Sequence, residues 1–138
     1  MANFIYVKAA ERMLAAALAG TLPAAGTLKA ALVKNTYLQS QSADEFYSDI
    51  SAYVVGTPQE VENLSFTGGK LDGDDVSVPD AAAAETIEAV VLYVDTGNPA
   101  TSWLLAFIDQ AGGLPHTTDG GPVEPTWDNG TYRILSLV

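Results

Sequence analysis

The sequence contains no cysteine in its 138 residues. Disulfide bonds, thiolate metal sites and a cysteine nucleophile are therefore excluded. No segment approaches the roughly 18 consecutive apolar residues that a membrane-spanning helix needs, so we predict no membrane partner. The length is that of one domain, and a domain of this size buries roughly 68–70% of its unfolded surface, enough to form a core without covalent cross-links.

Basic residues are also scarce. Six Lys and Arg stand against 17 Asp and Glu, which gives a net charge of −11, and there is one histidine. A field of this sign repels phosphate backbones and anionic lipids, so we predict no direct contact with nucleic acid. The negative charge is expected to keep the protein soluble or to favour docking onto a partner that carries basic patches.

The first part of the chain predicts one amphipathic helix over residues 7–19, followed by the helix-ending residues Gly20 and Pro23. Apolar side chains recur at helical spacing, at Val7, Ala10, Leu14 and Leu18. Charged side chains gather on another face, at Lys8, Glu11 and Arg12. We favour packing of the apolar stripe against a sheet over the alternative, docking of the stripe onto a partner.

Residues 13–19 have some features of a signal peptide, because an apolar run follows Lys8 and Arg12. The basic region is long, however, contains Glu11 and begins with aromatic residues, which is atypical of signal peptides. We therefore interpret this segment as part of the mature fold.

The strongest pattern is β-structure near the carboxyl end. Residues 86–94 and 102–109 alternate as strands around the turn at 95–99, and a third strand ending in Leu137 follows the turn at 128–130. Both long strands are apolar on both faces, with Glu88 as the exception. A strand of that kind belongs in the middle of a sheet or has its outer face covered.

Weaker patterns predict further strands at 27–33, 51–55, 60–66 and 71–78, with a hairpin turn at Gly68-Gly69. Residues 34–48 are polar and predict a surface loop, and the alanine-rich 80–85 predicts a connection. The sequence thus predicts a mainly β chain: an antiparallel β-sandwich of about eight strands with one N-terminal helix. We assign 1–138 to a single domain, with an arm at 1–6, the helix at 7–19 and the sandwich at 27–138.

The reactive side chains do not form a recognisable catalytic or metal-binding motif. The acidic run at 71–75 lacks the full calcium-loop pattern and is interpreted as a turn. His116, the only histidine, lies near Asp119 in a Gly- and Pro-rich stretch, which we interpret as an exposed loop. Three aromatic residues are compatible with a sugar-binding platform but favour a core role, namely Trp103, Trp127 and Tyr132. We predict no catalytic, cofactor-binding or metal-ligating residues and no enzyme activity.

Several motifs together resemble a family of small structural proteins of tailed bacteriophages, whose better-understood members are head decoration, or cement, proteins. The motifs are LDGDDV at 71–76, ETIEAVVLYVDTG at 85–97, PATS at 99–102, LAFID at 105–109, GLP at 113–115 and TWDNG at 126–130, with FYSDI at 46–50 in the first half. The resemblance covers most of the chain. Trp103 and His116 depart from the usual pattern.

The resemblance implies a jelly-roll-like sandwich on the outer surface of a virion capsid, assembled in the host cytoplasm, with the major capsid protein as partner and self-association as a homodimer. A neck or tail accessory protein and a carbohydrate-binding sandwich remain alternatives. We predict that partner contacts come from large side chains at the N-terminus and around the polar loop, namely Phe4, Ile5, Tyr6, Tyr37, Phe46 and Tyr47.

Overall fold

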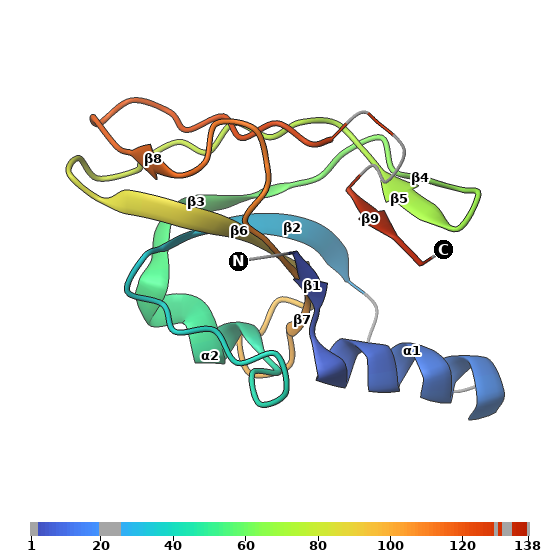
Figure 1. The fold of residues 1–138 in the computed structure, drawn as a ribbon. Helices are drawn as coiled ribbons and strands as arrows, with labels where there is room; N and C mark the ends of the chain where they lie inside the picture. Colours follow the sequence, from blue (N-terminus) through green and yellow to red (C-terminus); the bar gives the residue numbers. More distant parts are fainter. Residues whose placement is uncertain (1–2, 20–25, 129, 131–133, 138) are drawn as a thin grey trace.

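Two antiparallel sheets form the framework of the chain (Figure 1). The computed structural model describes residues 3–19, 26–128, 130 and 134–137. The helical elements are α1 (Val7–Ala19), α2 (Tyr47–Ile50) and a 3₁₀ turn, η1 (Ser51–Tyr53). The strands are β1 (Phe4–Ile5), β2 (Thr27–Lys34), β3 (Val54–Glu60), β4 (Ser65–Thr67), β5 (Lys70–Asp72), β6 (Thr86–Asp95), β7 (Trp103–Ile108), β8 (His116–Thr117) and β9 (Leu135–Ser136).

The larger sheet has the order β1-β7-β6-β2-β3, with β8 also paired to β6. Every residue of β7 is buried, as is most of β6. Both faces of the larger sheet are shielded from solvent. In Figure 1, α2 and the loop before it lie on one side, and the segments around β8, β4 and β5 lie on the other. This confirms the prediction that the two long apolar strands occupy the middle of a sheet.

The smaller sheet has the order β4-β5-β9. Gly68 and Gly69 form the turn between β4 and β5 with φ of 65° and 72°, a region that glycine enters without a steric penalty. The predicted hairpin at these glycines is therefore confirmed. The mainly β prediction with antiparallel sheets and one N-terminal helix is confirmed as well, and the helix has the predicted bounds. Gly20, Pro23 and part of the last predicted strand lie outside the described residues.

Three predicted strands have the wrong boundaries, and the one at 71–78 is shortened to β5 (Lys70–Asp72). Residues 51–53 form a 3₁₀ turn, and β3 begins at Val54 and continues through Gly56 and Pro58, which the predicted strands at 51–55 and 60–66 leave between them. Because β3 is the last strand in the sheet order, the missing N–H of Pro58 removes no necessary bond. The predicted strand at 60–66 is divided, because Asn63 adopts a positive φ of 53° and the chain passes from one sheet to the other.

The stretch around His116 is also more ordered than predicted. His116 belongs to β8, pairs with Ile87 and is half-buried. The connection at 80–85 contains no helix, as predicted. Within the described residues, no helix is both long and apolar enough to cross a membrane.

Candidate interaction surfaces

The acidic run at 71–75 holds a neighbouring segment in place. Asp75 accepts a hydrogen bond from the backbone N–H of Trp127 (2.8 Å), and the carbonyl oxygen of Asp74 accepts one from the Trp127 indole (2.8 Å). The Asp74 carboxylate also accepts a 2.6 Å bond from Asn63. In the part of the chain that the structure describes, no three side chains of metal-binding type come together. The run therefore has a positioning role for the segment that carries Trp127.

The polar groups near His116 are bonded to the backbone. Thr118 is buried, accepts a hydrogen bond from the Glu85 N–H and donates one to the Ala82 carbonyl. Asp119 accepts one from Gly121 N–H at 3.0 Å. These bonds fix the loop beside β8.

Three predicted contact residues belong to an aromatic cluster around Phe107. Phe4 stacks on Phe107 at 5.0 Å between ring centroids and meets Tyr6 edge-on at 5.2 Å. The hydroxyls of Tyr6 and Tyr37 are 2.9 Å apart, and Tyr37 donates a 2.6 Å bond to Asp44. Tyr6 and Tyr37 are buried, so their rings are not surface contacts in this conformation. Burial raises the pKa of both phenols far above the ordinary value.

Tyr47 lies beside a shallow cavity of about 290 Å³. Its ring is 4.7 Å from that of Tyr93, and Lys29 and Asp95 on the cavity wall form a 2.7 Å ion pair. The hydrogen bond from Lys29 lowers the pKa of Asp95, which also accepts a bond from the Gly97 N–H. The charged groups of this cavity thus stabilise the turn between β6 and β7.

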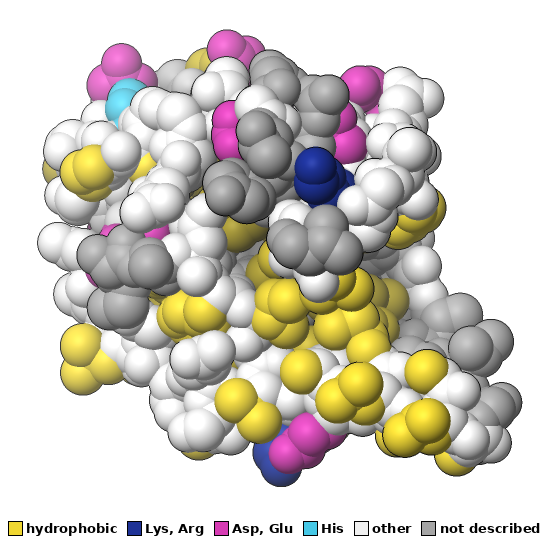
Figure 2. All heavy atoms as spheres, turned by 45° about the vertical axis from the view of Figure 1, so that its right-hand side comes forward, with side chains coloured by type: hydrophobic (Ala, Val, Ile, Leu, Met, Phe, Trp, Pro, Cys, Tyr) yellow, Lys and Arg dark blue, Asp and Glu magenta, His cyan; other side chains and the backbone are white. Residues whose placement is uncertain are grey.

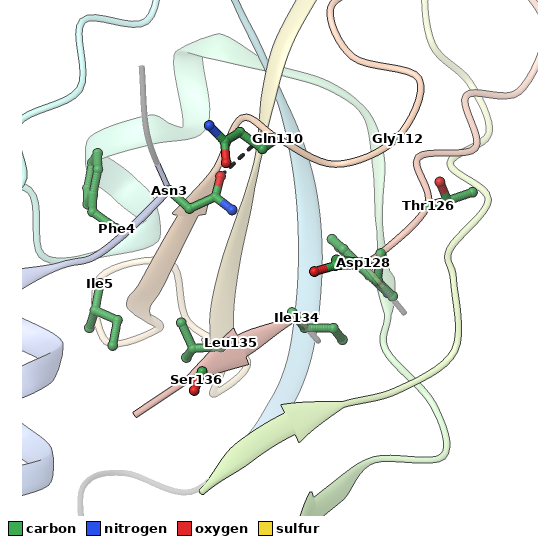
Figure 3. A pocket seen from close by; sticks show the side chains of 11 residues that line it. Asn3, Phe4, Ile5, Gln110, Gly112, Thr126, Asp128, Ile134, Leu135 and Ser136 are labelled. Carbon is green, nitrogen blue, oxygen red and sulfur yellow. Dashed lines mark hydrogen bonds between the residues drawn. The ribbon is translucent and has the colours of Figure 1, made fainter. Parts of the chain in front are cut away.

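Ile5 lines a larger groove of about 700 Å³ between β1 and β9, the edge strands of the two sheets (Figure 3). Figure 3 shows Asn3 at one end of this groove, bonded to Gln110. The Asn3 side-chain oxygen accepts hydrogen bonds from the backbone N–H groups of Asp109 (2.9 Å) and Gln110 (3.1 Å). Asn3 therefore ties the N-terminal strand to the end of β7.

The two described tryptophans do not form a sugar-binding platform. Trp103 and Trp127 are both buried, and a stacking platform needs exposed rings. Tyr132, the third predicted member, lies outside the described residues. The carbohydrate alternative thus loses two of the three rings on which it depended.

The helix α1 is attached through the opposite face from the one predicted. Arg12 forms a 2.6 Å ion pair with Glu45, and its guanidinium lies over the rings of Phe46 (5.0 Å) and Trp103 (5.9 Å). In α1, Ala9 is the buried residue. The predicted apolar stripe is exposed, most strongly at Leu14 and Leu18. The favoured packing of that stripe on a sheet is therefore wrong, because a charged residue with aromatic partners anchors the helix instead.

Replacing Arg12 with alanine is expected to lower the free energy of unfolding by about 1 kcal/mol, through loss of the cation–π contacts and the partly screened ion pair. Urea unfolding measures this change. Lys8→Ala is the matched control, because it removes an exposed helical pair with Glu11 at 3.2 Å worth only about 0.2–0.5 kcal/mol. Equal effects of the two substitutions would contradict the anchoring role.

An apolar groove of about 250 Å³ lies between α1 and the smaller sheet. Figure 2 shows hydrophobic side chains gathered on this face and continuing along α1. We call the groove and the adjoining exposed side chains of α1 the helix–sheet surface, consisting of Met13, Leu14, Leu18, Phe66, Leu71, Leu105, Leu135 and Leu137. Sequence reasoning did not single out Phe66 or Leu137, because their exposure depends on how the smaller sheet is assembled.

Comparison of the chain with family models, with curated proteins and with solved structures finds no match. The surfaces above are therefore interpreted from their own geometry and from the sequence motifs.

Proposed function

We propose that this protein is a structural protein of a tailed-bacteriophage virion that binds the outside of the head and stabilises it. The major capsid protein is the proposed partner. This partner is proposed because the motifs at 71–76, 85–97 and 126–130 resemble those of phage head decoration proteins. A two-sheet framework in which the carboxylates of the run at 71–75 and the Thr118 hydroxyl form internal hydrogen bonds supports a binding role rather than a catalytic one.

The observation that carries the binding role is the loop at 34–48. Leu38 on this loop is 87% exposed, whereas its neighbour Tyr37 is buried. The Asp44 carboxylate holds the loop by accepting bonds from the Tyr37 hydroxyl (2.6 Å) and the Ser40 N–H (2.9 Å). A large apolar side chain on a loop fixed in this way is prepared for a partner, because little conformational entropy is lost on binding.

Stabilisation of a capsid shell requires added contact area between its subunits and no chemical reaction. A specific interface buries about 1,600 Å², and a subunit that bridges two lattice positions gains avidity from the second contact. The net charge of −11 directs the protein towards basic patches on its partner and favours solubility. Repetition of such contacts over a head would raise its resistance to internal pressure.

The test is to mix the purified protein with heads that lack decoration and to measure bound copies and thermal resistance. We expect copies in proportion to the capsid subunits and a higher disruption temperature. Binding of a small fixed number at one vertex would favour the neck or tail alternative. Absence of binding together with unchanged head stability would refute the proposal.

Leu38→Lys is expected to weaken head binding at least about 10-fold, because it places a charge where an apolar side chain meets the lattice. Ala83→Lys is the matched control, since it adds the same charge at another exposed position. Binding isotherms on immobilised heads distinguish the two. Equal affinities for the two variants would remove Leu38 from the contact.

A further inference from the structure

The cavity of about 290 Å³ beside Tyr47 is built from segments that lie far apart in the sequence. Lys29 of β2 is the direct neighbour of Tyr93 of β6 across the larger sheet. Asp95 lies two residues beyond Tyr93, so the three side chains emerge on the same face of the sheet. Tyr47 of α2 forms another wall. The rest of the lining comes from β3 and from the turn between β6 and β7, namely Thr57, Pro58, Gly97, Pro99 and Ser102.

Backbone hydrogen bonds hold these walls in place. The N–H of Tyr47 donates to the carbonyl oxygen of Ser102 at 2.7 Å, and the N–H of Ser48 donates to the carbonyl oxygen of Pro99 at 3.1 Å. The hydroxyl of Ser102 donates to the Asp95 carboxylate at 3.2 Å. The polar groups of the cavity are therefore positioned in advance, which reduces the entropy that a ligand must lose on binding.

Two phenol hydroxyls at the cavity are available to a ligand. Tyr93 is only 4% exposed, yet its hydroxyl has no hydrogen-bond partner in the part of the chain that the structure describes. The oxygen is not sealed from solvent, so it faces the cavity that Tyr93 lines. Burial raises the pKa of Tyr93, which keeps the hydroxyl a donor near neutral pH. The Tyr47 hydroxyl, on the neighbouring wall, also has no partner among the described residues.

The charges at the cavity favour a neutral ligand. Lys29 and Asp95 are the charged residues that line it, and their 2.7 Å ion pair is neutral as a unit. A cation would meet Lys29, whereas an anion would meet Asp95 and the net charge of −11. Two adjacent hydroxyls can use both groups, because one donates to the carboxylate while the other accepts from an ammonium that has three N–H donors.

The walls and the volume of the cavity fit one sugar ring. Tyr47 is half-buried, so part of its ring is accessible, and Pro58 and Pro99 add apolar surface. Apolar and aromatic walls with a few fixed polar groups are typical of small-molecule sites. At about 30 Å³ per water molecule, the volume corresponds to about ten non-hydrogen atoms. This is the size of a monosaccharide, and its ring carbons would pack on the apolar walls while its hydroxyls meet the polar groups.

We propose that this cavity binds one neutral sugar ring through Lys29, Asp95 and the hydroxyls of Tyr47 and Tyr93. Neither Trp103 nor Trp127 lines the cavity, so the site is separate from the platform considered above. The inference goes beyond the proposed function and does not rest on it. For a ligand of this size in a shallow cavity, a Kd of about 1 mM is expected.

Titration of the isotope-labelled full chain with glucose, galactose, mannose and N-acetylglucosamine tests the site, with amide chemical shifts as the readout. We expect saturable shifts with at least one of these sugars, centred on Tyr47, Tyr93 and Gly97. Absence of saturation with every sugar up to about 100 mM, far above the expected Kd, would overturn the proposal. Saturable shifts centred on another part of the chain would overturn it as well.

Tyr93→Phe is expected to weaken sugar binding at least about 10-fold, because it removes one hydrogen-bonding hydroxyl and keeps the ring. Tyr53→Phe is the matched control. It makes the same change in a ring that lies 5.5 Å from that of Tyr37 and outside the cavity. Circular dichroism verifies both folds, and Tyr47→Phe measures the corresponding loss at a half-buried position. Wild-type affinity in both cavity variants, or equal weakening by Tyr53→Phe, would refute the assigned site.

Three further probes separate the classes of ligand. Glycerol has adjacent hydroxyls without a ring, N-acetylarginine amide is a cation, and glucuronate is an anionic sugar. Each is expected to bind at least about 10-fold more weakly than the best neutral sugar. Equal binding of glycerol would reduce the cavity to an adventitious diol site, and tighter binding of the arginine derivative would indicate a basic side chain of a protein partner. Either result, or tighter binding of glucuronate, would overturn the assignment to a neutral sugar.

Discussion

Leu92→Ala is expected to lower the free energy of unfolding by about 3–5 kcal/mol, at the upper end of the range for buried leucine. Leu92 is fully buried in β6, the central strand of the larger sheet. Its direct neighbours across the sheet are Ala30 in β2 and Ala106 in β7. Truncation would leave three alanines in a row, and small side chains anchored on paired strands cannot move in to fill the cavity.

Urea unfolding followed by circular dichroism measures this loss. Leu38→Ala is the matched control, because it deletes the same atoms from an exposed position and should change stability by no more than about 0.5 kcal/mol. Since small domains are stable by only about 5–15 kcal/mol, the core variant should unfold at a clearly lower urea concentration. A loss below about 1 kcal/mol would mean that the site collapses around the deletion.

The same residues explain why the central strands could be predicted from sequence. In β6 and β7, apolar side chains point to both faces, which only a strand covered on both sides can satisfy. Strand pairing then follows from the short turn at 95–99 that joins them. These features are local, so the sequence predicts 86–94 and 102–109, within about one residue of the bounds of β6 and β7.

The helix shows where local patterns fail. Its spacing of Val7, Leu14 and Leu18 marks an apolar face, but spacing does not say whether the protein or a partner covers that face. The face through which the helix is attached depends on the contacts of Arg12 with Glu45, Phe46 and Trp103. These residues lie far away in the sequence. No periodicity within 7–19 contains that information.

The aromatic contact residues show a second limit. Phe4, Tyr6 and Tyr37 are similar in sequence context, yet Tyr6 and Tyr37 are buried while Phe4 is partly exposed. Burial of the two tyrosines depends on the bond between hydroxyls 31 residues apart and on Asp44 as the final acceptor, whereas Phe4 has no hydroxyl to pair. A phenol that finds such partners is stable inside a core, whereas one without them would be held at the surface.

Stability is expected to fall steeply as the pH rises above about 10. Burial raises the pKa of Tyr6, Tyr37 and Tyr93 above their ordinary value of 10.0, and the bond to the Asp44 carboxylate adds to the effect at Tyr37. In the unfolded chain these phenols ionise near pH 10, while in the folded chain they stay protonated. Their stabilising contribution is therefore complete below pH 10 and is lost as the pH rises towards the folded-state values.

Each phenol that ionises only on unfolding contributes up to about 1.4 kcal/mol per pH unit. Three of them give a limiting slope of about 4 kcal/mol per unit, which is large against a typical stability of about 5–15 kcal/mol. Urea unfolding at several pH values between about 8 and 11 measures the slope, and tyrosinate absorbance should rise together with unfolding. The chain has six tyrosines, so the prediction is contradicted if all six form tyrosinate while the protein stays folded.

Tyr93→Phe isolates one of the three contributions. The substitution keeps the ring against Tyr47, at 4.7 Å in the wild-type protein, and removes the group that ionises. The slope above pH 10 should therefore fall by about one third, while stability near neutrality changes much less. An unchanged slope would show that the alkaline loss of stability does not come from the Tyr93 phenol.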